Sequence, residues 1–383
     1  MPREHASIAG VPNRSSEIVA GSSEPTSIGM VCVANSSTVP TDTLPAAAPL
    51  DVTLVISDQY PVLSAVPAFA PVTLSVCAFP SGSNPTTAKV IPAGVNNYFY
   101  GSALLLALLF IFISLLVFKM KPEFSYLLPL APAAIASMYI NWDLWAIATM
   151  MLAIYWFDRK QYTNSALLMA ISISTKFLPI FLLIPIAFIL WRDNKVKEAI
   201  KYMAVVAGTW IAINAPFALT TPTGWWRFYK LNLERGADWG SVWLALQQLG
   251  INFTNLNYLS ILLLLIALTS IAILLFELKY TPTLASVAFL VLASVMVASK
   301  VYSPQYVLWL TPLAAIALTN KKDLHAFWLW QATELIYHIA IWQHLAQVTD
   351  AKFGLGPTPF AILTLVRIGG TIYLMAVLAR RAL

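Results

Sequence analysis

Side chains capable of chemistry are concentrated in a few short polar breaks of an otherwise apolar sequence. The longest break, residues 227–243, reads RFYKLNLERGADWGSVW and mixes charges with tryptophan and tyrosine. Side chains that are apolar at one end and polar at the other are typical of a membrane–water boundary. Within this break Glu234 or Asp238 could act as a general base. A pair between Arg235 and a carboxylate could instead only rigidify the loop.

Two other breaks contain an acid and a lysine. Asn141 or Asp143 could cap the helix that follows, and Asp143 could also bind a sugar hydroxyl or pair with Lys176. Lys176 and Lys300 each allow two interpretations: the lysine reaches the interface alongside apolar groups, or it contacts a phosphate. With Arg235 as a third cation, these residues could neutralise a lipid-linked phosphate.

A further candidate pair, Glu334 and His338, lies inside a long apolar run. Their spacing of four residues places both on one helix face. Arg367, in the last apolar run, could neutralise Glu334. A buried structural ion pair and a proton relay are both compatible with this pattern.

Several chemistries have no matching sequence pattern. The sequence contains no Ser-His-Asp order, no metal-binding helix motif and no glycine-rich phosphate loop. Cys32 and Cys77, the only cysteines, match no metal or redox spacing. We therefore expect neither a metal nor a cofactor.

The composition predicts the elements that must position these residues. Of 383 residues, 59% are hydrophobic and 10% charged, and the mean hydropathy is +0.73. A soluble domain has about 25% charged residues. We therefore expect an all-α, polytopic membrane protein with about 10–12 transmembrane helices. The expected spans are 98–118, 124–141, 143–158, 163–175, 177–191, 198–219, 257–277, 281–299, 304–319, 324–346 and 357–380.

Basic residues predict the orientation of these spans. They recur at Lys119, Lys121, Arg159, Lys160, Arg192, Lys195, Lys197, Lys201, Lys279, Lys321, Lys322, Arg380 and Arg381. If these breaks are cytoplasmic, the alternate breaks fall on the outer face, provided that the 163–191 run turns near Lys176. The candidate residues of the breaks then share the outer face, which indicates a pocket there. The net charge of +6 is not gathered into a domain or tail, so we expect no nucleic-acid partner.

The N-terminal region differs from the rest. Residues 1–95 are expected to form an atypical, largely disordered region, and residues 96–383 a multi-span membrane domain. No cleavable signal peptide is indicated, and the prolines within Val62–Phe79 make it a poor spanning helix.

Four motifs in order give the sequence a family resemblance. Asn141–Leu144 (NWDL), Ser174–Pro179 (STKFLP), Glu234–Ser241 (ERGADWGS) and Lys300–Trp309 (KVYSPQYVLW) resemble motifs of the actinobacterial polyprenol-phosphate-mannose-dependent mannosyltransferases of glycosyltransferase family 87. The resemblance covers about residues 95–381. It implies a GT-C membrane fold and transfer of a hexose, mannose above all, from a polyprenyl phosphate donor. The acceptor would be a cell-envelope glycan or glycolipid on the outer face of the cell membrane.

The resemblance also implies roles for individual residues. Tyr302 and Gln305 in the fourth motif join the other candidates as substrate-binding residues. In such enzymes a first outer loop carries the catalytic carboxylate, and Gln59–Ser64 (QYPVLS) resembles a remnant of the sequence that follows it, which makes Asp58 the candidate base. The alternatives are a polyprenyl-lipid flippase or transporter, and a catalytically inactive member of the family.

Overall fold

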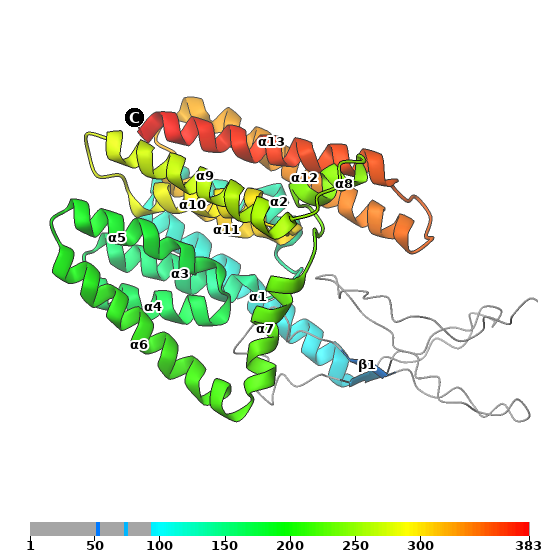
Figure 1. Ribbon diagram of the computed structural model, residues 1–383, viewed down its shortest axis with the longest axis horizontal. Coiled ribbons are helices and arrows are strands. Elements are labelled where there is room, and N and C mark those ends of the chain that lie inside the picture. Colours follow the sequence, from blue (N-terminus) through cyan, green and yellow to red (C-terminus); the bar gives the residue numbers. More distant parts are fainter. Residues whose placement is uncertain (1–50, 54–72, 76–92, 383) are drawn as a thin grey trace, which may run out of the picture.

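The computed structural model describes residues 51–53, 73–75 and 93–382 (Figure 1), and most of the residues after 92 are helical. The apolar runs form these helices because their backbone groups can be satisfied only within the helix when no water is available. The long and medium helices are α1 (Ala93–Met120), α3 (Asp143–Asp158), α4 (Tyr162–Thr175), α5 (Leu183–Arg192), α6 (Val196–Thr220), α7 (Pro222–Glu234), α9 (Leu256–Glu277), α10 (Leu284–Ala298), α11 (Val307–Ala317), α12 (Leu324–Val348) and α13 (Pro357–Ala382). The short ones are α2 (Pro132–Ser137), α8 (Val242–Gln248) and the 3-10 turns η4 (Pro122–Leu127), η5 (Leu178–Leu182), η6 (Pro304–Tyr306) and η7 (Lys321–Asp323).

Two three-residue strands precede the helices. β1 (Asp51–Thr53) and β2 (Thr73–Ser75) pair antiparallel, with Val52 opposite Leu74. Most of the predicted N-terminal region, 1–95, including Asp58 and both cysteines, lies outside the described residues. Residues 93–382 contain helices and no strand, so the all-α class is confirmed for this part of the chain.

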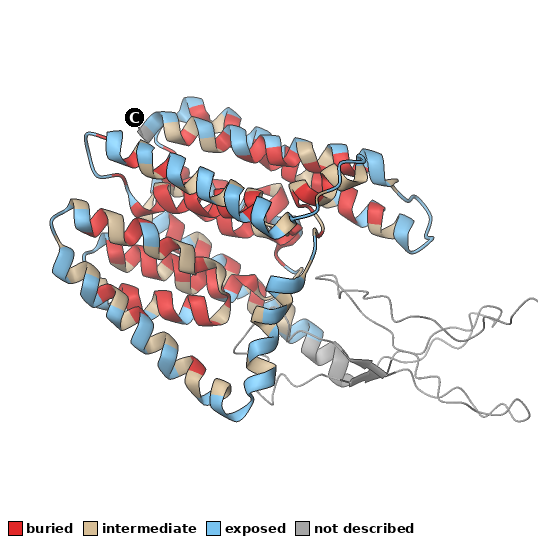
Figure 2. Cartoon of the chain, viewed as in Figure 1, coloured by how far each residue is buried: buried red, intermediate tan, exposed pale blue. Residues whose placement is uncertain are grey.

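Within the described part of the chain, four helices are long and apolar enough to cross a membrane: Phe99–Met120, Val196–Thr220, Leu256–Glu277 and Pro357–Arg381. Their outer faces carry large apolar side chains, such as Leu104, Leu108 and Leu115 on α1, that are exposed in the fold. Figure 2 shows the same exposure along α6 and α9. Apolar helices with apolar exposed faces suit a lipid environment rather than water, so the fold has the character of a membrane protein.

The core lies around α10 and α11, which are buried along almost their whole lengths (Figure 2). Both helices are shorter than a membrane-spanning helix, at 15 and 11 residues. Their apolar sequences therefore reflect burial against other helices as much as contact with lipid.

Two predicted elements take a different form. The expected span 124–141 is divided into η4 and α2, because Pro129 and Pro132 each lack the N–H group that a continuous helix requires. The break 227–243, expected to be a loop, is helical as far as Glu234. The expected turn in the 163–191 run is confirmed, since α4 ends at Thr175 and Lys176 is extended, with φ −146° and ψ 131°.

The helix connections gather at two opposite ends of the fold. At one, the basic end, Arg192 donates to the carbonyl oxygen of Leu275 at 2.5 Å and Arg381 pairs with Asp323 at 2.8 Å. Tyr280 donates to the carbonyl oxygen of Arg381 at 3.4 Å. These contacts join the α5–α6, α9–α10 and α11–α12 connections to the end of α13.

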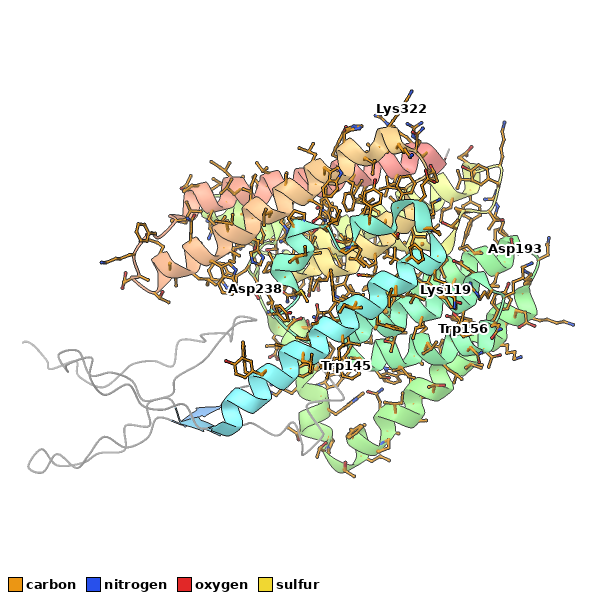
Figure 3. All side chains as sticks on the ribbon, turned by 180° about the vertical axis from the view of Figure 1, so that it is seen from behind. Lys119, Trp145, Trp156, Asp193, Asp238 and Lys322 are labelled. Carbon is orange, nitrogen blue, oxygen red and sulfur yellow. The ribbon has the colours of Figure 1, made fainter. Side chains whose placement is uncertain are left out.

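The other end, the motif end, carries the alternate breaks, which contain the four motifs. In Figure 3, Lys119, Asp193 and Lys322 lie toward the basic end, whereas Trp145 and Asp238 lie toward the motif end. The α12–α13 connection also lies there, at the right of Figure 1. The basic breaks and the alternate breaks thus lie at opposite ends, and the orientation of these ends in a membrane stays a prediction.

Candidate functional site

A buried ion pair connects the first two motifs. Lys176, in the extended residue after α4, pairs with Asp143 in the first turn of α3. Asp143 also accepts a hydrogen bond from Trp309 Nε1 at 2.9 Å. The main-chain N–H of Asp143 donates to Asn141 Oδ1 at 3.0 Å, so the capping role expected of Asn141 is present. The pairing of Asp143 with Lys176 is the ion pair that the sequence suggested.

The third motif is a rigid turn between α7 and α8. Arg235 Nη2 lies 2.5 Å from Asp238 Oδ2, and Asp238 Oδ1 accepts the N–H of Trp239 at 2.6 Å. Ser241 then caps α8 by accepting the N–H of Leu244 at 3.1 Å. The Arg235–Asp238 pair therefore shapes the turn, as one of the two sequence-based interpretations expected.

Gly240 lets this turn approach the core closely. Its φ is +75°, a backbone conformation that residues with a Cβ atom rarely adopt. A Cβ placed there would collide with the carbonyl oxygen of Tyr302 and lie 2.5 Å from Tyr337 Oη and 2.8 Å from Arg367 Nη1. Only glycine fits at this position, where the third motif packs against Tyr302, Tyr337 and Arg367.

Lys300, in the fourth motif, binds the end of α7. Its ammonium donates to the carbonyl oxygen of Arg235 and to Asn257 Oδ1, both at 2.6 Å. The carbonyl oxygens of Asn232 and Leu233 lie at 3.3 and 3.4 Å. The C-terminal carbonyls of a helix carry partial negative charge, so a lysine placed there stabilises the helix end.

A second buried ion pair lies below the fourth motif. Arg367 Nε donates to Glu334 Oε2 at 2.7 Å, and both side chains are almost completely buried. Tyr302 Oη donates to Glu334 Oε1 at 3.0 Å, and the Arg367 guanidinium stacks 3.6 Å from the centroid of the Tyr302 ring. Arg367 also donates to the carbonyl oxygens of Tyr302 and of Ser303, the latter at 3.0 Å. The expected pairing of Glu334 with Arg367 is therefore confirmed, and it holds the fourth motif in place.

Main-chain and ring contacts join the four motifs into one network. The N–H of Asp238 donates to the carbonyl oxygen of Lys300 at 2.8 Å, and the N–H of Tyr302 to that of Trp239 at 3.3 Å. The Lys176 ammonium lies 5.3 Å from the centroid of the Tyr306 ring, which stands 6.2 Å from that of Tyr302. Segments up to 168 residues apart thus meet at the motif end, since the network runs from Asn141 to Trp309.

Three polar atoms in this network are buried without a hydrogen-bond partner among the residues that the structure describes. They are Arg235 Nε, Trp239 Nε1 and Gln305 Oε1. Buried polar groups are normally satisfied, because an unpaired one costs about 1–3 kcal/mol. Two N–H donors and one amide acceptor of the network are thus buried without a partner among the described residues.

Two expected site residues lie apart from the network. Glu234 is exposed at the end of α7, 3.9 Å from Lys230. His338 faces Ser137, whose hydroxyl is 3.3 Å from Nδ1, while its Nε2 accepts from Trp342 at 3.2 Å. Glu334 and His338 share a helix face in α12, but no hydrogen bond between them is among the contacts of the described residues.

Two residues of the site were not among the sequence-based candidates. Trp309 lies four residues after Gln305, so helix periodicity alone would have placed it on the same face. His344 stacks on Phe360 with ring centroids 4.3 Å apart and contacts Trp239 at 5.2 Å. No sequence pattern identifies His344, because its partners come from α13 and the third motif.

Comparisons with known proteins give no match: no protein-family model and no curated protein matches the chain. Among the described residues, no group of three or more histidine, cysteine, aspartate or glutamate residues could hold a metal ion.

Proposed function

We propose that the protein is a membrane glycosyltransferase of GT-C architecture. It transfers a hexose, mannose in our proposal, from a polyprenyl phosphate donor to a cell-envelope glycan or glycolipid. The observation that carries the proposal is the convergence of the four motif segments at one end of the fold. Charged and polar residues are rare within apolar segments. When such residues from separate motifs form a binding site, they are expected to lie together in the fold.

Arg235 is our candidate for binding the donor phosphate. A guanidinium has five N–H donors, and Nε–H of Arg235 has no partner among the described residues. The side chain as a whole is 15% exposed, whereas Nε itself is buried, so a phosphate would approach the guanidinium from its exposed part. An arginine already held in place by Asp238 loses little conformational entropy on binding an anion.

Lys300 has a different role in this proposal. An ammonium has three N–H donors, and four oxygen atoms already lie within 3.4 Å of Lys300 Nζ. We therefore assign it to positioning Arg235 rather than to direct contact with phosphate. Lys176, which neutralises Asp143, holds the first two motifs beside Tyr306 in the same way.

The reaction is an inverting displacement at the anomeric carbon. An acceptor hydroxyl forms the new C–O bond, the bond to the donor phosphate breaks, and the phosphate oxygen keeps the electron pair. Arg235 stabilises the departing phosphate electrostatically. No metal or cofactor enters the step.

The hydroxyl proton must pass to a carboxylate. Asp143, Asp238 and Glu334 each already accept from a cation, respectively Lys176, Arg235 and Arg367. Glu234 is exposed outside the network, and we therefore place the general base at Asp58, the residue that the family resemblance implies, which lies outside the described residues. Asn141, Tyr302 and Gln305 complete the proposed substrate-binding set; the amide oxygen of Gln305 is buried and has no hydrogen-bond partner among the described residues.

The test uses membranes containing the full chain and polyprenyl phosphate carrying radiolabelled mannose. We expect radiolabel in a glycan or glycolipid fraction, at a rate that Arg235→Gln lowers at least about tenfold, equivalent to about 1.4 kcal/mol. Lys230→Gln is the matched control, because Lys230 is an exposed cation on α7. Movement of labelled donor across the bilayer without transfer would instead identify a flippase. The absence of both transfer and movement would identify an inactive protein.

A further inference from the structure

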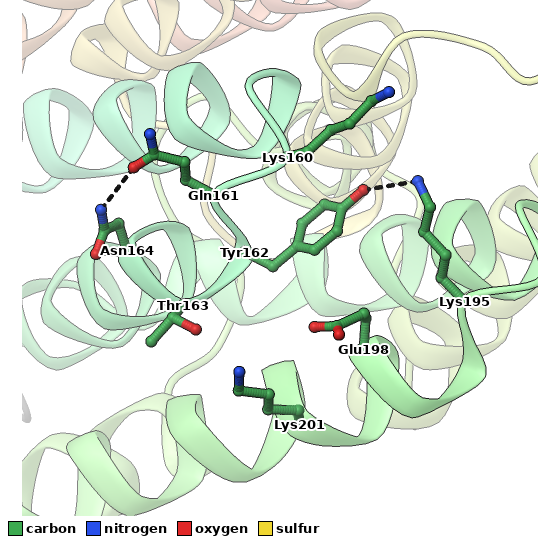
Figure 4. Close-up of a pocket in the computed structure, with 8 residues that line it drawn as sticks. All are labelled: Lys160, Gln161, Tyr162, Thr163, Asn164, Lys195, Glu198 and Lys201. Atoms are coloured by element: carbon green, nitrogen blue, oxygen red, sulfur yellow. Dashed lines mark hydrogen bonds between the residues drawn. The ribbon is translucent and has the colours of Figure 1, made fainter.

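A second site lies at the basic end, away from the four motifs. The starts of α4 and α6 enclose an open pocket of about 510 Å³ (Figure 4). It is lined by Lys160, Gln161, Tyr162, Thr163, Asn164, Lys195, Glu198 and Lys201. None of these residues belongs to the proposed transferase site.

The charge of the pocket favours an anion. Three lysines and one glutamate line it, a formal net charge of +2. Lys160 and Lys201 are exposed, and no ion pair of either is found among the described residues. In Figure 4 the Lys201 ammonium points toward the space between Thr163 and Glu198. Glu198 opposes an anion, which provides a residue whose removal should strengthen binding.

Lys195 is held at the rim of the pocket. Its ammonium donates to Tyr162 Oη at 3.0 Å and lies 3.6 Å from Asp193. The hydrogen bond to Tyr162 is the main cause of a pKa of Lys195 above its ordinary value, so this side chain is a cation at neutral pH. The Tyr162 hydroxyl thereby fixes a positive charge at one wall.

The pocket also offers neutral donors. Thr163 contributes a hydroxyl, and the Asn164 amide, which donates to Gln161 Oε1 at 2.8 Å, is oriented beside it. α4 and α6 both begin at the pocket, and neither has a side-chain cap on its first N–H groups. Uncapped helix starts carry partial positive charge, which adds to that of the lysines.

The position of the pocket on α6 suggests where its ligand comes from. α6 is one of the four helices that could cross a membrane, and the pocket lies at its first two turns. Val196 and Ile200, beside the lysines, are exposed apolar residues. If the phosphate bound by the lysines belongs to a phospholipid, the acyl chains of that lipid can run along this exposed apolar face.

We propose that this pocket binds a phosphate group, supplied either by the headgroup of an anionic phospholipid or by a soluble phosphate. Lys201 contacts its oxygens, Lys160 and Lys195 supply positive charge at the rim, and Thr163 and Asn164 donate hydrogen bonds. The proposal does not depend on the transferase activity at the motif end.

Binding is tested with the purified full chain in a neutral detergent, titrated with dioctanoyl phosphatidic acid and, as the zwitterionic reference, dioctanoyl phosphatidylcholine. We expect saturable binding of the first, weakened at least about fivefold by Lys201→Gln. Glu198→Gln should strengthen it. Lys197→Gln is the matched control, because Lys197 is an exposed lysine in the same helix turn that does not line the pocket.

The sources are separated by competition. Displacement by inorganic phosphate in the millimolar range indicates a soluble ligand, and resistance to it indicates a lipid headgroup; both support a phosphate site. The proposal is overturned if neither dioctanoyl phosphatidic acid nor inorganic phosphate binds saturably, or if Lys197→Gln weakens binding as much as Lys201→Gln, which would indicate diffuse attraction only. Tighter binding by Glu198→Gln cannot arise from misfolding, so the test holds even if a lysine variant is unstable.

Discussion

Lys300 and Arg235 are joined by a 2.6 Å hydrogen bond from the lysine ammonium to the arginine carbonyl oxygen. Because Arg235 is also paired through its side chain with Asp238, its main chain and its guanidinium are both fixed. Lys300 makes a second contact with the same turn, because its main-chain carbonyl oxygen accepts a hydrogen bond from the N–H of Asp238. Two segments 65 residues apart thus hold each other at both ends of a short turn.

The first prediction concerns this link. Lys300→Met keeps the length of the side chain but removes the donors that close the end of α7. We expect faster amide hydrogen exchange over residues 231–238 and slower sugar transfer, because Arg235 loses its fixed position. Lys352→Met, an exposed lysine in the α12–α13 connection at the same end, is the control and should change neither. Unchanged exchange over 231–238 in Lys300→Met would contradict a positioning role.

The second prediction concerns the buried pair of Glu334 and Arg367. Arg367→Leu leaves a carboxylate without its cation in the core, and we expect it to destabilise the fold by about 3–5 kcal/mol. Glu334→Leu/Arg367→Leu removes both charges and should be clearly more stable than Arg367→Leu. Thermal unfolding of the purified variants in detergent measures the difference. A double variant no more stable than the single one would show that the two groups do not act as a pair.

The third prediction concerns Gly240. Gly240→Ala adds a Cβ that meets the carbonyl oxygen of Tyr302 and requires a positive φ, so the third motif must move away from the fourth. We expect a loss of sugar transfer together with a lower unfolding temperature. Gly236→Ala, at a glycine of the same motif with no atom within 4 Å of an added Cβ, should have little effect. Equal behaviour of the two variants would contradict the close approach.

The fourth prediction concerns orientation in the membrane. In a background with Cys32→Ser and Cys77→Ser, Gly236→Cys at the motif end should react with an impermeant maleimide added to intact cells. Lys322→Cys, at the basic end, should react only after permeabilisation (Figure 3), because basic connections face the cytoplasm. The reverse pattern would place the proposed transferase site on the cytoplasmic face.

Local sequence explains where the helices begin and end. The breaks at Asn141–Asp143, Lys176 and Lys300 all coincide with helix boundaries, because each polar or extended residue interrupts an apolar run. The prediction was wrong around the prolines of residues 129–132, where the expected single span 124–141 is two short helical pieces. Apolar composition also could not separate lipid-facing helices from α10 and α11, which are buried by other helices, since both environments select the same residues.

The sequence by itself determined the all-α class and the alternation of basic and other breaks, and it offered two of the ion pairs, Asp143–Lys176 and Glu334–Arg367, among several interpretations. It could do so because charges are costly in apolar surroundings and must find partners. Only the tertiary structure decided that Lys300 binds the end of α7, that Glu234 stands outside the network, and that Gly240 lies against Tyr302. These contacts join residues distant in the chain, and their geometry depends on how whole helices pack rather than on any local pattern.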